Sequence, residues 1–98
     1  MIEVRLPPQS LDAEMATIGA CVISRTATDY ATARLHASDY YLQAHRRIFD
    51  AIGYLAMKSI VPDTLTIHEE LLRRGQSESV GGFAYLNTLA ESVPTAAH

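Results

Sequence analysis

The sequence contains a single cysteine, Cys21, and no tryptophan. One cysteine excludes an intrachain disulfide and a cysteine-rich metal site, which fits a reducing compartment. No apolar run approaches the ~20 residues that a membrane-spanning helix needs. The N-terminus also lacks the apolar stretch of roughly 7–15 residues that marks a secretory signal. We therefore expect a soluble, cytoplasmic protein with no membrane partner.

Basic residues are also scarce, because the formal net charge is −3. A domain that binds nucleic acid usually carries a stripe of lysine and arginine that neutralises phosphates. Direct nucleic-acid binding is therefore not expected. The 98 residues, 48% of them apolar, suffice for one domain with a modest core.

The prolines divide the chain into three parts. Pro7 and Pro8 predict an extended N-terminal arm over residues 1–9. Residues 10–93 carry helical patterns and form the predicted head domain. Residues 94–98, beginning at Pro94, resemble the first turn of a further helix whose remainder is missing.

Apolar residues recur at helical spacing in the first half of the chain. Ser10 is a predicted N-cap, and the pattern after it indicates one apolar helical face. Gly19 belongs to a strip of small residues that would let another helix approach closely. A shorter helix is predicted near Tyr30, with Thr28-Asp29 as its cap, and a third from about Leu42 to Met57.

The second half predicts two more helices. Thr66 and Glu69 match a capping box that would start the fourth helix, and Gly75 would end it. Within that helix the spacing favours the ion pairs Glu69–Arg73 and Glu70–Arg74. A fifth apolar face runs from Phe83 to Val93. No alternating strand pattern is present, so the predicted fold is all-α: a compact bundle of about five short helices with the start of a truncated sixth.

Gly81-Gly82 precedes the fifth helix and raises the question of a phosphate-binding loop. A helix N-terminus can bind an anion, but the lysine and the preceding strand of a Walker-type loop are missing here. The glycines are therefore interpreted as a helix entry with close backbone packing. No cofactor-binding residue is predicted.

The remaining candidate chemistry also has a structural interpretation. The four histidines lack the spacing of an H-E-x-x-H zinc site. His45 and His68 are each interpreted as partly buried histidines that bond a carbonyl or a nearby acid, and Cys21 as a small core residue. We predict no catalytic residue and no metal site. Tyr85 stands at the edge of the fifth apolar face, which suits either a protein interface or the rim of the core.

Four segments, taken in order, resemble a known family: "LPPQSLDAEMATIGACVI" at 6–23, "DYYLQAHRRIFDAI" at 39–52, "VPDTLTIHEELLRRGQ" at 61–76 and "VGGFAYLNTLAESVPTAAH" at 80–98. They look like the N-terminal domain of DnaB-type replicative DNA helicases. The resemblance implies a helical head that precedes a helical hairpin, a linker and a RecA-like ATPase ring. It places ATP and Mg only in that ATPase domain, which is absent here, so this fragment is expected to be no enzyme.

The same resemblance implies partners. Heads of this family self-associate as a dimer or hexamer collar, recruit the C-terminal domain of primase and can contact a helicase loader. Asp12, early in the first helix, and Tyr85 resemble positions that contribute to primase docking. The sequence departs from the family pattern at Tyr40, where phenylalanine is frequent, and at His68, where a small residue is common.

Two alternatives remain open at this stage. The chain could be a free-standing helical regulator that competes for primase or loader. It could also be a small DNA-binding domain that uses Arg46, Arg47, Arg73 and Arg74, in which case binding would depend steeply on salt.

Overall fold

A computed structural model describes residues 10–93, and every regular element within that range is helical. The all-α class predicted from the sequence is thereby confirmed. The predictions for the arm at 1–9 and for the helix start at 94–98 lie outside the described residues. The elements are α1 (Leu11–Ile23), α2 (Arg25–Arg34), the 3-10 turn η1 (Ala37–Asp39), α3 (Gln43–Met57), α4 (Thr64–Arg73), α5 (Ser77–Val80) and α6 (Gly82–Glu91).

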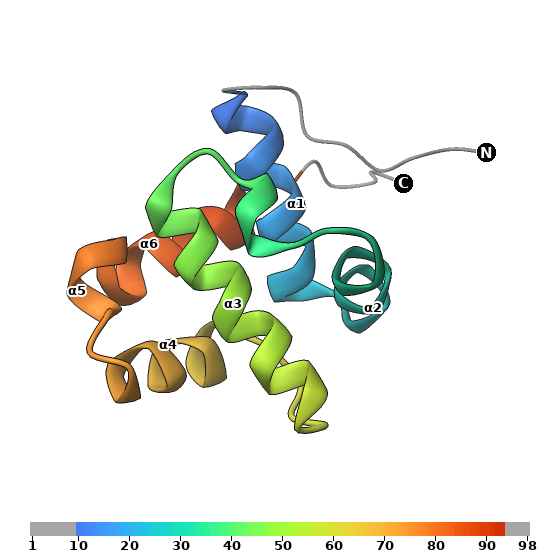
Figure 1. Cartoon of the computed structure of the whole chain (residues 1–98). Coiled ribbons are helices and arrows are strands. Elements are labelled where there is room, and N and C mark those ends of the chain that lie inside the picture. Colours follow the sequence, from blue (N-terminus) through green and yellow to red (C-terminus); the bar gives the residue numbers. More distant parts are fainter. Residues whose placement is uncertain (1–9, 94–98) are drawn as a thin grey trace.

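The helices pack around one apolar core (Figure 1). α3 crosses the middle of the molecule and contacts α1, α2, α4 and α5, while α1 also packs against α2 and α6. Within the described range, no helix combines the length and apolar character needed to cross a membrane. The core residues that are fully excluded from solvent include Ile18, Ile48, Ile52, Ile67, Leu71, Leu86 and Leu89.

The start of α1 agrees with the sequence, but the start of α2 does not. Ser10 caps α1 by accepting a hydrogen bond from the Ala13 N–H at 3.4 Å. The predicted cap of the second helix at Thr28 is wrong, because Ser24 caps α2 and accepts from the Ala27 N–H at 3.1 Å. Thr28 is instead fully buried inside α2. Its hydroxyl group donates to the Cys21 carbonyl at 2.8 Å, which ties α2 to α1.

α4 begins three residues earlier than the predicted capping box. Asp63 is the N-cap; its carboxylate accepts from the Thr66 N–H at 2.8 Å, and its own N–H donates to the Thr66 hydroxyl at 2.9 Å. The prediction of a capping box between Thr66 and Glu69 is therefore wrong. Thr66 does take part in a capping box, but as its third helical position, because an aspartate precedes it at the right spacing.

The predicted end of this helix at Gly75 is confirmed. Gly75 has a φ of +70°, and its N–H donates to the Leu72 carbonyl at 3.0 Å. The next N–H, of Gln76, donates to the Leu71 carbonyl at 2.8 Å, which completes a Schellman ending. One turn of helix, α5, then precedes α6. The sequence did not reveal α5 because four residues are too short to show a helical period.

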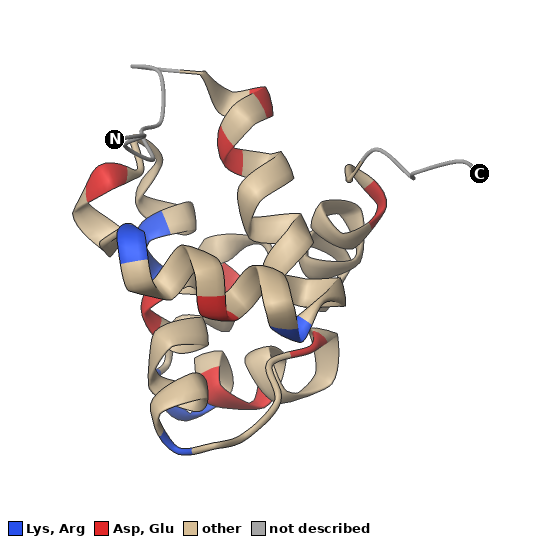
Figure 2. Ribbon diagram, turned by 90° about the vertical axis from the view of Figure 1, so that its right-hand side faces the viewer, with Lys and Arg blue, Asp and Glu red and all other residues tan. Residues whose placement is uncertain are grey.

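Charged residues of both signs are spread over the ribbon (Figure 2). On α4, Glu70 binds both Arg73, at 2.9 Å, and Arg74, at 2.7 Å. The predicted Glu70–Arg74 pair is confirmed, whereas Arg73 pairs with Glu70 and not with Glu69 as predicted. The hydrogen bonds from Arg73, followed by those from Arg74, outweigh burial and lower the pKa of Glu70 to about 2.

Gly81 shows why glycine precedes α6. It is the N-cap residue of α6 in the left-handed conformation, with a φ of +109°. A Cβ atom here would lie 2.7 Å from the Cβ atom of Tyr85. The helix entry interpreted from the sequence is thus confirmed, but the close contact involves only Gly81 and a side chain, because a Cβ atom at Gly82 would meet nothing within 4 Å.

Gly19 lets α1 and α6 approach each other closely. A Cβ atom at this position would lie only 2.1 Å from the Leu89 carbonyl oxygen and 2.8 Å from Cγ2 of Val93. Neither the backbone oxygen nor the buried surroundings can give way easily, since Gly19 is itself buried. This contact confirms the close helix approach that the small-residue strip predicted.

Gly19→Ala should therefore destabilise the domain by about 1–3 kcal/mol, the usual cost of overpacking a core. Helix propensity alone would make the alanine variant more stable, by up to about 1 kcal/mol. A net loss of stability would therefore have to come from the steric contact. Gly53→Ala is the matched control, because a Cβ atom there meets nothing within 4 Å inside α3. Urea unfolding of both variants measures the effect, and equal stability changes would contradict the α1–α6 contact.

Candidate protein-interaction site

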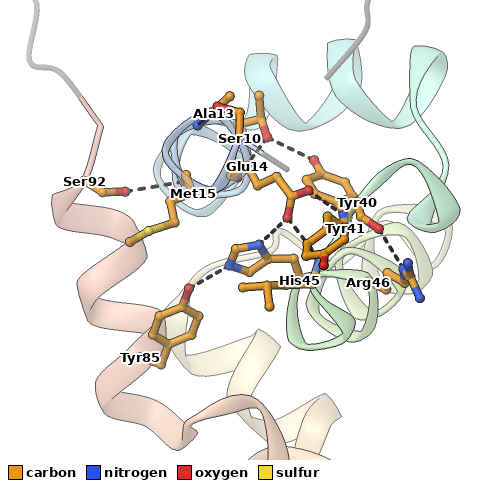
Figure 3. Close-up of polar contacts among 12 residues, drawn as sticks. Ser10, Ala13, Glu14, Met15, Tyr40, Tyr41, His45, Arg46, Tyr85 and Ser92 are labelled. Atoms are coloured by element: carbon orange, nitrogen blue, oxygen red, sulfur yellow. Dashed lines mark hydrogen bonds and ion pairs between the residues drawn. The ribbon is translucent and has the colours of Figure 1, made fainter. Parts of the chain in front are cut away.

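A chain of polar side chains joins α1, α3 and α6 (Figure 3). Nδ1 of His45 lies 2.7 Å from Oε1 of Glu14, and Nε2 of His45 lies 2.6 Å from the hydroxyl oxygen of Tyr85. His45 and Glu14 are buried, with exposed fractions of 0% and 1%, whereas Tyr85 is partly exposed. The chain therefore runs from the core toward the surface.

Glu14 also fixes the segment that leads into α3. Its carboxylate accepts hydrogen bonds from the backbone N–H groups of Tyr41 and, at 3.4 Å, Leu42. Leu42 is the N-cap of α3 and has no side-chain oxygen to offer that helix. A carboxylate near a helix N-terminus is favoured by the unpaired N–H groups and by the helix dipole. A residue of α1 thus supplies the anion at the start of α3.

These contacts keep Glu14 ionised despite its burial. Burial acts to raise the pKa of this carboxyl, but the hydrogen bonds from His45, Tyr41 and Leu42 outweigh burial and lower its pKa. A buried carboxylate with several donors is the arrangement in which the charged form is preferred. Glu14 therefore acts in this chain as an acceptor only.

Aromatic rings surround the histidine. The rings of His45 and Tyr85 are stacked, with centroids 5.9 Å apart and an interplanar angle of 7°. The ring of Tyr40 meets His45 edge-on at 6.4 Å. Tyr40, a departure from the family pattern, is fully buried, and its hydroxyl group lies 3.1 Å from the Thr17 hydroxyl. The extra oxygen is therefore accommodated by a hydrogen bond, while burial raises the pKa of Tyr40.

The two residues proposed for partner binding occupy different environments. Asp12 is exposed in the first turn of α1, beside Leu11, which is 42% exposed. Tyr85 lies at the rim of the core, and its hydroxyl group bonds to His45. Tyr85 is linked through His45 to Glu14 on α1. Glu14 lies two residues after Asp12, but the structure shows no direct contact between Asp12 and Tyr85.

Sequence reasoning predicted a partly buried His45 bonded to a backbone carbonyl or a nearby acid, and it did not identify Glu14 as that acid. The signal was present, because Glu14 lies four residues before Ile18 and seven before Cys21, on the face that is buried in α1. An acid on such a face must find donors inside the protein. Only the three-dimensional packing shows which donors these are.

His68 and Cys21 have structural roles in the described part of the chain. Nδ1 of His68 lies 3.3 Å from the Ser77 hydroxyl, and its ring packs against Phe83 with centroids 5.2 Å apart. Cys21 is fully buried, and burial raises the pKa of its thiol to about 11, so a reactive thiolate is disfavoured. Residues 10–93 hold no group of three or more histidine, cysteine or acidic side chains that could bind a metal.

Acid should weaken the fold through Glu14. Its folded-state pKa lies below the ordinary value of 4.5. The stability that Glu14 contributes is therefore present above about pH 4.5 and is lost as the pH falls through the lower folded-state pKa. Glu14→Gln is the matched variant, expected to be less stable than the wild type by about 1–3 kcal/mol at neutral pH. Urea unfolding across the acid range should show this difference shrinking; a constant difference would be inconsistent with an ionised Glu14.

Comparisons with known proteins agree with the resemblance of the sequence. Residues 6–98 match the family model described as the DnaB-like helicase N terminal domain. A replicative DNA helicase DnaB of Mycobacterium leprae is 40% identical over 96% of this chain and 16% of that protein. A second, from Geobacillus stearothermophilus, is 40% identical over 96% of this chain and 21% of that protein. The replicative DNA helicase DnaC of Bacillus subtilis is 37% identical over the whole chain and 22% of that protein.

A solved structure gives the same answer for the fold. The crystal structure of the N-terminal domain of DnaB helicase from Mycobacterium tuberculosis superimposes with a TM-score of 0.86 at 40% identity, over 94% of this chain and 64% of that one. The chain thus spans about a fifth of the curated relatives that it matches. By sequence and by fold, this chain belongs to the DnaB-like helicase N-terminal domain family.

Proposed function

We propose that this domain is the non-catalytic head of a replicative DNA helicase, which helps to assemble the hexamer collar and docks primase during DNA replication. Its partners are further copies of the chain, the C-terminal domain of primase and, as a second docking protein, a helicase loader. Family membership supports the first part of the proposal. ATP hydrolysis with Mg²⁺ is assigned to a separate ATPase domain of the parent protein, acting in the cytoplasm.

The observation that carries this proposal is the match of residues 6–98 to the DnaB-like helicase N-terminal domain, and large apolar side chains on the surface of the described residues are compatible with it. Exposed apolar area on a small domain is a common feature of protein–protein contact sites. Several of these side chains are more than half exposed, including Met57 at 76% and Ile23 at 58%. The full set is Leu11, Ile23, Tyr30, Tyr41, Met57, Ile60, Val61, Leu65, Leu72 and Phe83.

The position of the primase site is taken from the resemblance and is compatible with this surface. Asp12 is accessible on the first turn of α1, next to the exposed Leu11. Tyr85 offers a partly exposed ring on α6, which packs directly against α1. The exposed carboxylate of Asp12 beside the exposed side chain of Leu11 suits a partner helix with a basic side.

The DNA-binding alternative loses support from the arginines. Arg73 and Arg74 share the carboxylate of Glu70, and Arg46 donates to the Tyr40 carbonyl at 2.7 Å. Arg47 donates to the Ser79 hydroxyl at 2.7 Å. The carboxylate of Glu70 offsets one of the two charges of Arg73 and Arg74, whereas Arg46 and Arg47 bond to neutral oxygens and keep their charge. With a formal net charge of −3, the domain still lacks the basic excess that phosphate binding favours. A free-standing regulator of primase would use the same surface as the proposed helicase head and would differ from it only in lacking an ATPase domain.

Asp12→Asn should weaken binding of the primase C-terminal domain about threefold or more, with a larger effect at low salt, because a rim charge acts mainly through steering. Glu69→Gln is the matched control, since it removes the same charge from an exposed position on α4. Calorimetric titration at two salt concentrations, with DNA as a separate ligand, measures both effects. Equal losses in the two variants would remove Asp12 from the interface, and absence of primase binding by the wild type would contradict the proposed function.

A further inference from the structure

We propose that Glu14 and His45 are positioning residues that point the hydroxyl proton of Tyr85 into the protein. A docked partner that reaches the Tyr85 oxygen then meets only acceptor lone pairs and must place a hydrogen-bond donor against it. This inference rests on the proposed function in one respect, namely that Tyr85 contacts the partner. The direction of the proton follows from the geometry of the buried chain together with a singly protonated His45 ring.

Glu14, at the buried end of the chain, has no proton to donate. Its two oxygens face three donors: His45 and the backbone N–H groups of Tyr41 and Leu42. The two backbone N–H groups can only donate, and a carboxylate can accept from both of them and from Nδ1 of His45 at the same time. The lowered pKa of Glu14 agrees with that arrangement.

The imidazole of His45 is the middle member of the chain. Because Glu14 accepts, Nδ1 of His45 must carry a proton across the 2.7 Å contact. With one proton on the ring, Nε2 is a lone pair and can only accept. The hydroxyl group of Tyr85, at 2.6 Å from Nε2, then donates inward. The planes of the two rings are nearly parallel, at 7°, which is compatible with a hydrogen bond to the in-plane lone pair of Nε2.

The direction of this proton decides which group a partner must offer. A tyrosine hydroxyl group has one proton, and once it is committed to His45 the oxygen can only accept from outside. The complementary group on the partner is an ammonium, a guanidinium or an amide N–H. A cationic donor is favoured, because the protein as a whole has a formal net charge of −3 and the exposed Asp12 lies early on the neighbouring helix α1.

Glu14→Gln should reverse the direction of the hydrogen bonds from residue 14 through His45 to Tyr85. Glutamine has as many side-chain heavy atoms as glutamate, so the contacts themselves can be kept. Oε2 of Glu14 accepts from the Tyr41 N–H, whereas Oε1 faces His45 and accepts from the Leu42 N–H only at the long distance of 3.4 Å. The amide oxygen of glutamine will therefore face Tyr41, and the amide NH₂ will face His45. That NH₂ donates to Nδ1, so the ring proton moves to Nε2 and donates to Tyr85. The hydroxyl proton of Tyr85 is then free to point outward.

The first test is the protonation of His45 in the unliganded wild-type chain, measured by ¹⁵N nuclear magnetic resonance of the imidazole. The measurement is made at about pH 8, above the ordinary histidine pKa of about 6.5. We expect the neutral form with the proton on Nδ1, and in Glu14→Gln the form with the proton on Nε2. A proton on Nε2 in the wild type, in either the neutral or the doubly protonated ring, would overturn the inference. This readout needs no partner, and the wild-type result stands even if the variant does not fold.

The second test is calorimetric titration with the primase C-terminal domain. Tyr85→Phe, which keeps the ring, should lose about tenfold in affinity through the missing acceptor. Glu14→Gln should lose less, because the Tyr85 oxygen then accepts from His45 with one lone pair and keeps only the other for the partner. Circular dichroism confirms that the variants compared are folded. Wild-type binding with unchanged affinity in both variants would overturn the partner's donor role while leaving the proposed function intact. No binding by the wild type would instead overturn the proposed function.

Discussion

The ionised carboxylate of Glu14 inside the core is the constraint on which much of this domain depends. A buried charge is costly unless donors surround it, so the fold must deliver them. They come from His45 on α3 and from the backbone just before α3, which fixes where that helix starts relative to α1. His45 in turn holds Tyr85, and α6 is thereby tied to the same centre. One anion thus orients three helices.

Packing between α1 and α6 complements this polar centre. Gly19 brings the two helix backbones within a distance that no side chain would permit. The rigid pair of helices carries both candidate docking residues, Asp12 on α1 and Tyr85 on α6. A surface whose elements are fixed in this way loses little conformational freedom on binding, which favours affinity. The core and the proposed interface are therefore parts of one arrangement.

Much of the fold could be predicted from the sequence, because helical periodicity and capping are local. The apolar faces of α1, α3 and α6 and the ending at Gly75 depend on residues within a few positions of one another. Errors arose where two local solutions competed: Asp63 and Thr66 each could have capped α4, and tertiary packing buried Thr28 where a cap was expected. The short α5 was missed because it has no period to detect.

The site was less accessible to sequence reasoning. The sequence indicated that Tyr85 suits either an interface or the rim of the core. It did not indicate the hydrogen bond to His45, because the two residues lie 40 positions apart. The acid on the buried face of α1 was a visible signal, yet its partners are set by the approach of three helices. Long-range hydrogen bonds of this kind have no local pattern. The family resemblance pointed to Asp12 and Tyr85, and neither position is tested by the fold itself.

We propose that the partner surface lies where α1 and α6 meet, next to the hydrogen-bonded residues Glu14, His45 and Tyr85. Hydrogen exchange of the domain, measured with and without saturating primase C-terminal domain, would locate that surface. Added protection is expected in the first turns of α1 and in α6, with little change in α2 and α4. Protection confined to α2 or α4 would show that the partner binds elsewhere.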